Sequence, residues 1–320
     1  MHSPLSSLSV EANGRHDAPD VIQIVVGLDD GYACQMTVML LSLFERNGAV
    51  QIHVHALVPT DFRSETLITN TLGVYANHVT FRRLDASVVA NLKKWFERSR
   101  AIYYRLLIGS LLPESVKRVI YLDCDMLICG SISELWCQPL GTAIVAAVSD
   151  PGFTQHAVLG LEASAPYFNS GMLLIDLERW RAEQIGELAF QFAESNSERI
   201  TFPDQCALNW VLKGRWLELP SQWNVQSSML GRFRNGLFIY PRHLQSNARG
   251  ARIIHFSGAG RPWHYLDEHP FKQQYQDFKS RTPWAGDPFP DRFPHFIAIK
   301  ILRRWAPFLL PAYLQLRKYV

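Results

Sequence analysis

The chain has 320 residues, 48% of them hydrophobic and 19% charged, with a formal net charge of +3. This length and composition suit one large globular domain or two modest ones and argue against a repeat array. The stretch 292–320 holds six basic residues and no acidic one, so the rest of the chain has a net charge of −3. Because the basic excess belongs to this tail, we do not expect the main domain to bind nucleic acid.

The first twenty residues are polar and lack the apolar core of a signal peptide, so a disordered leader is expected over 1–20. No stretch offers the ~18 uninterrupted apolar residues of a membrane-spanning helix. The five cysteines, an odd number without an export signal, indicate reduced thiols rather than a disulfide framework. Together these features favour a cytoplasmic protein.

Strand and helix patterns alternate along the chain. Strands are expected over 22–28, 52–58, 79–84, 116–125, 143–150 and 251–256, and helices over 37–44, 64–78, 101–114 and 202–214. The stretch 167–180 indicates a turn, a strand and then a helix that begins near Asp176. This alternation predicts an α/β fold with a mainly parallel sheet and helices on both faces.

We find no linker before about residue 285, so one domain is expected over 21–285, followed by a basic, aromatic tail over 286–320. A helical wheel of 294–306 places three cations on one side of a helix, opposite four apolar residues: Lys300, Arg303 and Arg304 against Ala298, Ile301, Leu302 and Trp305. This pattern favours contact of 292–320 with an anionic membrane. The alternative is a terminal helix that packs on the domain with its cations solvated.

Two carboxylates follow the apolar strand that ends at Leu122. Asp123 and Asp125 flank a cysteine, and Asp29 follows another strand. Ligands of open α/β sheets bind beyond the carboxyl ends of strands. Two carboxylates suit Mg²⁺ or Mn²⁺, and His255, at the end of a further strand, favours Mn²⁺ by adding a nitrogen. The alternatives are turn capping by the aspartates and a structural role for the histidine.

A glycine-rich turn follows His255. Gly258 and Gly260 would let backbone N–H groups approach an anion, and Arg261 would add a counter-charge. A metal, a glycine loop and an arginine together describe a site for a diphosphate.

Five segments resemble motifs of glycosyltransferase family 8. YLDCDMLICGSISELW is similar to the family's D-x-D segment, and HFSGAGRPW to its H-x-x-G-x-x-K-P-W motif. YFNSGMLLIDLERW resembles the F-N-x-G block, PDQCALN the D-Q-x-x-L-N segment, and GLDDGYA the A-x-D-x-x-Y start. The segments occur in family order over roughly residues 21–265.

The resemblance implies a GT-A fold and a retaining transferase that uses Mn²⁺ or Mg²⁺ and a UDP-sugar, with galactose and glucose both open. It implies the metal ligands Asp123, Asp125 and His255. It implies these nucleotide contacts: Asp29, Tyr32, Asp123, Gly258 and Arg261. It implies these residues around the donor sugar: Arg105, Asp150, Asn169, Asp204 and Gln205, the last nearest the reacting carbon. Arg105, Asp150 and Asn169 also have ordinary structural interpretations.

Two positions depart from the family pattern. Arg261 stands where the family usually has Lys and keeps the charge as a wider planar group. Gly31 stands where related bacterial enzymes can carry Asn, so one nucleotide contact would be lost. The acceptor that the resemblance implies is a surface glycan or glycolipid such as a lipopolysaccharide core, reached at the inner face of the cytoplasmic membrane. The alternatives are a glycogenin-like self-glycosylating primer and a catalytically silent binder of sugar nucleotides.

Overall fold

The computed structural model describes residues 21–85, 87, 101–234, 237–309 and 313. The leader expected over 1–20 lies outside these described residues. In the part of the chain that the structure describes, no helix is long and apolar enough to cross a membrane. All five cysteines are free thiols, and Cys137 is exposed.

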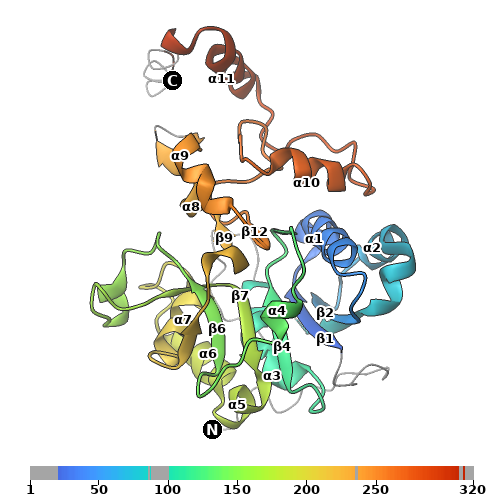
Figure 1. The fold of residues 1–320 in the computed structure, drawn as a ribbon, viewed down its shortest axis with the longest axis vertical. Helices are drawn as coiled ribbons and strands as arrows, with labels where there is room; N and C mark the ends of the chain where they lie inside the picture. The colour runs from blue at the N-terminus through green and yellow to red at the C-terminus, as the bar shows by residue number, and fades with distance from the viewer. Residues whose placement is uncertain (1–20, 86, 88–100, 235–236, 310–312, 314–320) are drawn as a thin grey trace.

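A seven-stranded sheet forms the lower half of the molecule in Figure 1. In spatial order its strands are β3 (Val79–Leu84), β2 (Ile52–Pro59), β1 (Ile22–Gly27), β4 (Arg118–Leu122), β7 (Phe168–Asp176), β6 (Val145–Ser149) and β8 (Trp216–Glu218). β7 runs antiparallel to both neighbours, and the other pairs are parallel. The mainly parallel sheet predicted from the sequence is therefore confirmed.

Helices cover both faces of this sheet. The α-helices of the described residues, which include those beyond this sheet, are α1 (Ala33–Arg46), α2 (Glu65–Leu72), α3 (Ile108–Leu111), α4 (Ser133–Trp136), α5 (Leu177–Ala182), α6 (Ile185–Ser195), α7 (Pro203–Val211), α8 (Ser227–Leu230), α9 (Arg242–Gln245), α10 (Lys272–Lys279) and α11 (Pro294–Trp305). Ile24 and Val26 of β1 join the core beneath α1 and α4, while Val25 joins the core beneath α6 and α7. Alternate side chains of one strand thus enter two cores, which explains its continuous apolar sequence.

A small sheet lies between the large sheet and α10 and α11, which occupy the top of Figure 1. In it β12 (Ile253–His255) pairs antiparallel with β5 (Met126–Ile128) and parallel with β9 (Val225–Gln226). A two-stranded ribbon joins β10 (Arg232–Arg234) to β11 (Leu237–Ile239). Since β4 belongs to the large sheet and β5 to the small one, residues 123–125 link the two.

Four details differ from the sequence predictions. The helix expected over 64–78 changes at Gly73 into a 3₁₀ helix, and the one over 101–114 is 3₁₀ as far as Leu107. The turn expected before the strand of 167–180 is wrong, because β7 already begins at Phe168 and pairs with β6 across an irregularity in register. The cations of α11 are also not all solvated, since Lys300 and Arg303 donate to backbone carbonyls of the domain.

Candidate active site

The link 123–125 is fixed to both sheets by its backbone. The N–H of Asp123 donates to the carbonyl of Gly171 on β7 at 2.8 Å. The carbonyl of Asp125 accepts from the N–H of Phe256, just after β12, at 2.9 Å. The carboxylates therefore meet where the ends of β4, β7 and β12 converge.

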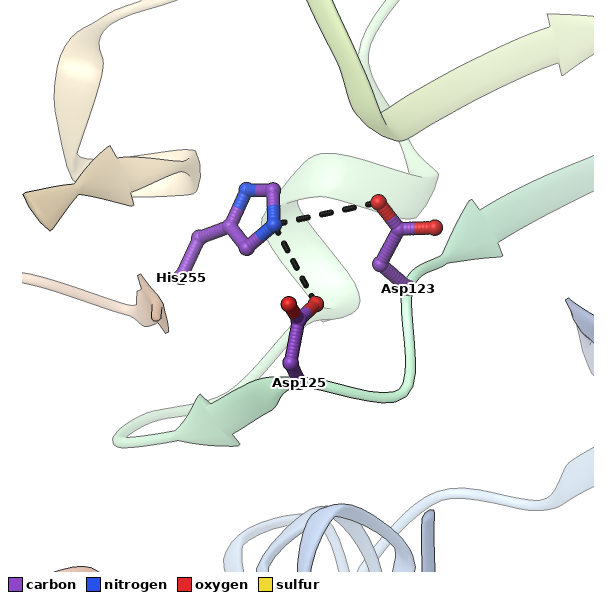
Figure 2. Close-up of side chains that lie close together, drawn as sticks. All are labelled: Asp123, Asp125 and His255. Carbon is purple, nitrogen blue, oxygen red and sulfur yellow. Dashed lines mark ion pairs between the residues drawn. The ribbon is translucent and has the colours of Figure 1, made fainter. Parts of the chain in front are cut away.

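Three metal-ligating groups meet at this point (Figure 2). The Nε2 atom of His255 lies 3.3 Å from Oδ1 of Asp125 and 3.7 Å from Oδ2 of Asp123. One ligand atom from each of the three lies within 4.8 Å of the others, and His255 is only 4% exposed. Two carboxylate oxygens and one imidazole nitrogen suit a divalent cation such as Mn²⁺ or Mg²⁺, with positions left for other oxygens.

Burial and neighbouring charges shift the pKa values of all three residues of this cluster. Burial raises the pKa of Asp123 to about 6, although Arg105 opposes the shift. Burial also acts to raise the pKa of Asp125, but His255 and Arg261 hold it below its usual value. Burial acts to lower the pKa of His255, but Asp125 and Asp123 raise it overall. Two buried carboxylates beside one imidazole form a site whose negative charge suits a cation.

Gly171 makes the close approach of these groups sterically feasible. A Cβ at this position would lie 2.3 Å from Cε1 of His255 and 2.8 Å from Oδ2 of Asp123. Its N–H donates to Oδ1 of Asn169, while its carbonyl holds the backbone of Asp123. A side chain at 171 would therefore push apart two of the three candidate ligands.

Arg105 holds the cluster from the opposite side and is 5% exposed. Its Nη2 atom lies 2.6 Å from Oδ1 of Asp123, and its Nε lies 2.9 Å from Oδ2 of Asp204. Its Nη1 donates to both the carbonyl and the hydroxyl of Ser170 at 2.8 Å. The guanidinium therefore leaves Oδ2 of Asp123 on the His255 side.

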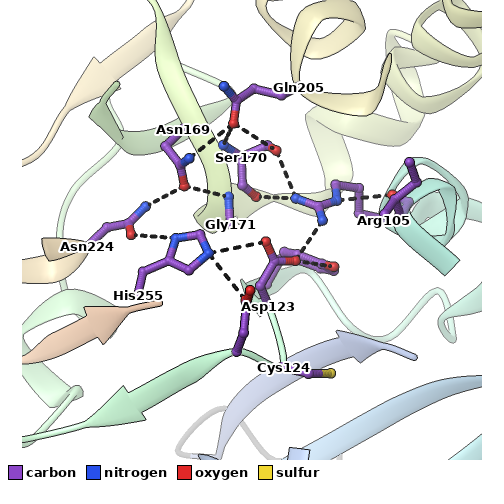
Figure 3. A network of polar contacts seen from close by, with 12 residues as sticks. Arg105, Asp123, Cys124, Asn169, Ser170, Gly171, Gln205, Asn224 and His255 are labelled. Carbon is purple, nitrogen blue, oxygen red and sulfur yellow. Dashed lines mark hydrogen bonds and ion pairs between the residues drawn. The ribbon is translucent and has the colours of Figure 1, made fainter. Parts of the chain in front are cut away.

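An amide network continues from Arg105 towards β6 (Figure 3). Oε1 of Gln205 accepts from Nδ2 of Asn169 and from the N–H of Ser170, both at 3.1 Å. Nε2 of Gln205 donates to Oδ2 of Asp150 at 3.0 Å. The five residues that the resemblance places around the donor sugar therefore lie together with Asp123.

A cleft of about 580 Å³ lies beside α1. The residues that line it are Asp29, Asp30, Gly31, Tyr32, Gln35, Pro59, Asp61, Arg261, Trp263 and Pro290. Arg261 lines this cleft, and its charge also acts to lower the pKa of Asp125. Gly258 has a left-handed φ of +69°, and its carbonyl accepts from Nε of Arg261 at 2.9 Å.

Asp29 and Asp30 both make hydrogen bonds within the chain. Asp29 accepts from the N–H of Gly31 at 3.0 Å and caps the short 3₁₀ helix Asp30–Tyr32. Asp30 accepts from the N–H and hydroxyl of Ser64, at 2.9 and 2.7 Å, just before α2. Turn formation, which the sequence left open for Asp29, is therefore part of what this residue does.

Three buried partners escaped the sequence reasoning. Oδ1 of Asn224 accepts from Nδ1 of His255 at 3.0 Å, and its Nδ2 donates to Oδ1 of Asn169 at 2.9 Å. Tyr121 donates to Oδ1 of Asp123 at 3.0 Å, and Ser170 joins Arg105 to Asp204. Tyr121 and Ser170 stand beside motif residues, whereas nothing local marks Asn224 as a partner of His255.

Comparison with known proteins decides the family. The model of glycosyl transferase family 8 matches residues 23–267. The chain belongs to glycosyltransferase family 8. General stress protein A of Bacillus subtilis is 31% identical over 283 residues, which cover 84% of this chain and 97% of that protein. A lipopolysaccharide 1,2-glucosyltransferase of Escherichia coli K12 is 31% identical over 275 residues, covering 84% of this chain and 80% of the relative.

Solved structures show the same fold. The galactosyltransferase LgtC, in complex with donor and acceptor sugar analogues, superposes with a TM-score of 0.71 at 22% identity and covers 83% of this chain and 99% of that one. The bifunctional glycosyltransferase WbbM gives a TM-score of 0.67 at 20% identity, covering 84% of this chain and 51% of WbbM. The predicted GT-A fold and the prediction of a glycosyltransferase are thus confirmed.

The steric requirement at residue 171 gives a first prediction. We expect Gly171→Ala to weaken Mn²⁺ binding at least about tenfold, because the new methyl group displaces His255 and Asp123 and misplaced ligand support has effects of this order. Titration of free Mn²⁺ by electron paramagnetic resonance measures the affinity. Gly48→Ala is the matched control, since a Cβ there meets only the Phe44 carbonyl at 4.0 Å. Equal affinity in the Gly171 variant and the control would refute the steric role.

Proposed function

We propose that this glycosyltransferase moves a hexose, galactose or glucose, from a UDP-sugar to a glycan acceptor, with retention at the anomeric carbon. The observation that carries the proposal is the cluster Asp123–Asp125–His255, together with a cleft whose lining residue Arg261 acts electrostatically on Asp125. Such a pairing of candidate metal ligands with a cation suits a diphosphate. Asp29 and Tyr32 line the same cleft and would bind the nucleoside.

The three ligands would hold Mn²⁺ or Mg²⁺, and the bound ion would supply positive charge against which the diphosphate departs. Arg261 would add charge on the cleft side, and the turn at Gly258 would let backbone N–H groups approach the phosphates. Arg105 keeps Asp123 in position and neutralises Asp204. The site is therefore built to favour departure of UDP.

Front-face attack fits the way the nearby carboxylates are engaged. Asp204 is 6% exposed and accepts from Arg105 and Ser170, so its Oδ2 is not a free nucleophile. Both oxygens of Asp150 also accept hydrogen bonds, from Gln205 and Gly152. We therefore propose that the acceptor hydroxyl oxygen bonds to C1 on the face from which UDP leaves. The C1–O bond electrons go to the phosphate, which takes the hydroxyl proton.

The proposed acceptor is a lipopolysaccharide core or a similar glycan. The support is the similarity to the 1,2-glucosyltransferase of E. coli and to a lipopolysaccharide 1,3-galactosyltransferase of Salmonella typhimurium, which is 27% identical. The name of the B. subtilis relative, general stress protein A, specifies no acceptor. Intact mass after incubation with donor separates this proposal from self-glycosylation, which would add hexose units to the chain itself.

We further propose that the protein acts at the inner face of the cytoplasmic membrane and touches it through 292–320. On α11 and the turn after it, Ile301 is 55%, Trp305 74% and Phe308 77% exposed. Arg292 is also exposed. Aromatic side chains beside cations are typical of surfaces that enter an anionic lipid interface.

Release of UDP from a panel of UDP-sugars tests the proposed reaction. We expect one donor to be used, only with Mn²⁺ or Mg²⁺, and Asp125→Asn to lower the rate by at least about a hundredfold, as loss of a charged metal ligand commonly does. The product anomer, read by NMR with an acceptor glycan, should match the donor. Donor binding without turnover on any acceptor would favour a silent binder, and an inverted anomer would exclude the front-face reaction.

Flotation with vesicles tests the membrane proposal. Vesicles with anionic lipid should carry the wild type, while neutral vesicles should not, and Trp305→Ser with Phe308→Ser should reduce binding severalfold through lost apolar burial. Val74→Ser is the control, because Val74 is 82% exposed on the 3₁₀ helix Gly73–His78, away from the tail. Equal recovery of wild type and double variant would argue against this surface.

A further inference from the structure

The segment Phe289–Arg303 lies beyond the family match, which ends at residue 267, yet it reaches the donor cleft. Pro290 lines this cleft together with Arg261 and Trp263. The cleft wall therefore combines family residues with a residue from the C-terminal extension.

The extension holds the backbone of Tyr265 from both sides. Oδ1 of Asp291 accepts from the N–H of Tyr265 at 2.6 Å. Nζ of Lys300 donates to the carbonyl of Tyr265 at 3.3 Å, and Nη1 of Arg303 donates to the carbonyl of Leu266 at 3.2 Å. Three side chains of the extension thus satisfy consecutive backbone groups of one short segment.

Side chains of the extension also surround the ring of Tyr265. Nζ of Lys300 lies 4.3 Å from the ring centroid, and the guanidinium of Arg292 lies 5.6 Å from it. The ring of Phe289 packs edge-on at 5.9 Å. Below, Ile299 of α11 is 1% exposed and packs against Leu266. The contact between the extension and 265–266 is therefore a packed interface.

This interface is two residues from the cleft. Trp263 lines the cleft, and the N–H of His264 donates to the carbonyl of Arg261 at 3.0 Å, so 261–264 form a tight turn. A shift of Tyr265 would therefore also move Trp263 and Arg261, because the hydrogen bond from His264 to Arg261 closes the turn that connects them.

We propose that Phe289–Arg303 is part of the donor site and that Asp291 and Lys300 are positioning residues for the donor-binding turn Arg261–Tyr265. The inference rests on the proposed function, since it assumes that the cleft takes a nucleoside diphosphate. Neither residue lines the cleft, so both act through Tyr265. Their loss should weaken donor binding and leave the chemical step almost unchanged.

Calorimetric titration with UDP and Mn²⁺ tests the proposal on the full chain. We expect Asp291→Ala and Lys300→Met each to raise the Kd for UDP roughly 3- to 10-fold, the effect of losing one partly buried hydrogen bond to the backbone of Tyr265. With the donor sugar, KM should rise by a similar factor while kcat changes less than about twofold, since uniform binding is lost. Asp291→Asn retains an acceptor oxygen and should behave like the wild type.

Lys213→Met is the control for Lys300→Met, because Lys213 is exposed after α7. An unchanged Kd for UDP in both Asp291→Ala and Lys300→Met would overturn the proposal. It would also be overturned if the controls Asp291→Asn and Lys213→Met lost as much affinity for UDP as these two variants. A lower number of binding sites at unchanged Kd would mean partial unfolding and would also overturn it. If the wild type fails to bind UDP, the proposed function itself fails, which the titration separates from these outcomes.

Discussion

The ion pairs of buried Arg105 are the interaction on which the site depends. Asp123, Asp125 and Asp204 bring three carboxylates close to one another, and the guanidinium bridges two of them. Removing one partner of a buried pair typically costs about 3–5 kcal/mol, because the other charge is left uncompensated. By pairing with Oδ1 of Asp123, Arg105 also orients the carboxylate so that Oδ2 faces His255. One side chain therefore gives both charge balance and orientation.

The second constraint is close approach between two sheets. β4 delivers Asp123 from the large sheet and β12 delivers His255 from the small one, and Gly171 on β7 leaves the space in which they meet. Asn224 then fixes the ring of His255 through Nδ1, which leaves Nε2 directed at the carboxylates. A hydrogen bond at one imidazole nitrogen that directs the other to a cation is a common device of metal sites.

The features that stand in a local sequence motif could be predicted from the sequence. The strand of 22–28, the D-x-D link and His255 each stand in a recognisable pattern. The common edge of the first two follows from β1 and β4 being parallel neighbours, whereas β12 brings His255 from the small sheet. Asn224 could not be found in this way, because its partners are 31 and 55 residues away and no pattern around it indicates a site. The helical wheel of 294–306 predicted a helix that the structure confirms. The bond from Lys300 to the carbonyl of Tyr265 could not be predicted in this way, because a wheel shows only residues of the same helix. The boundary near 285 was predicted from a change in composition, and hydrogen bonds from 291, 300 and 303 to 265–266 cross it.

The central claim is that Asp123, Asp125 and His255 bind one divalent cation and that UDP binds in the cleft lined by Arg261. Anomalous diffraction at the manganese edge, from crystals grown with Mn²⁺ and UDP, tests it most directly. The account predicts one strong peak about 2.0–2.3 Å from an oxygen of each aspartate and from Nε2 of His255, with UDP density running past Arg261. A peak bound elsewhere, or UDP bound with no peak at these residues, would contradict it.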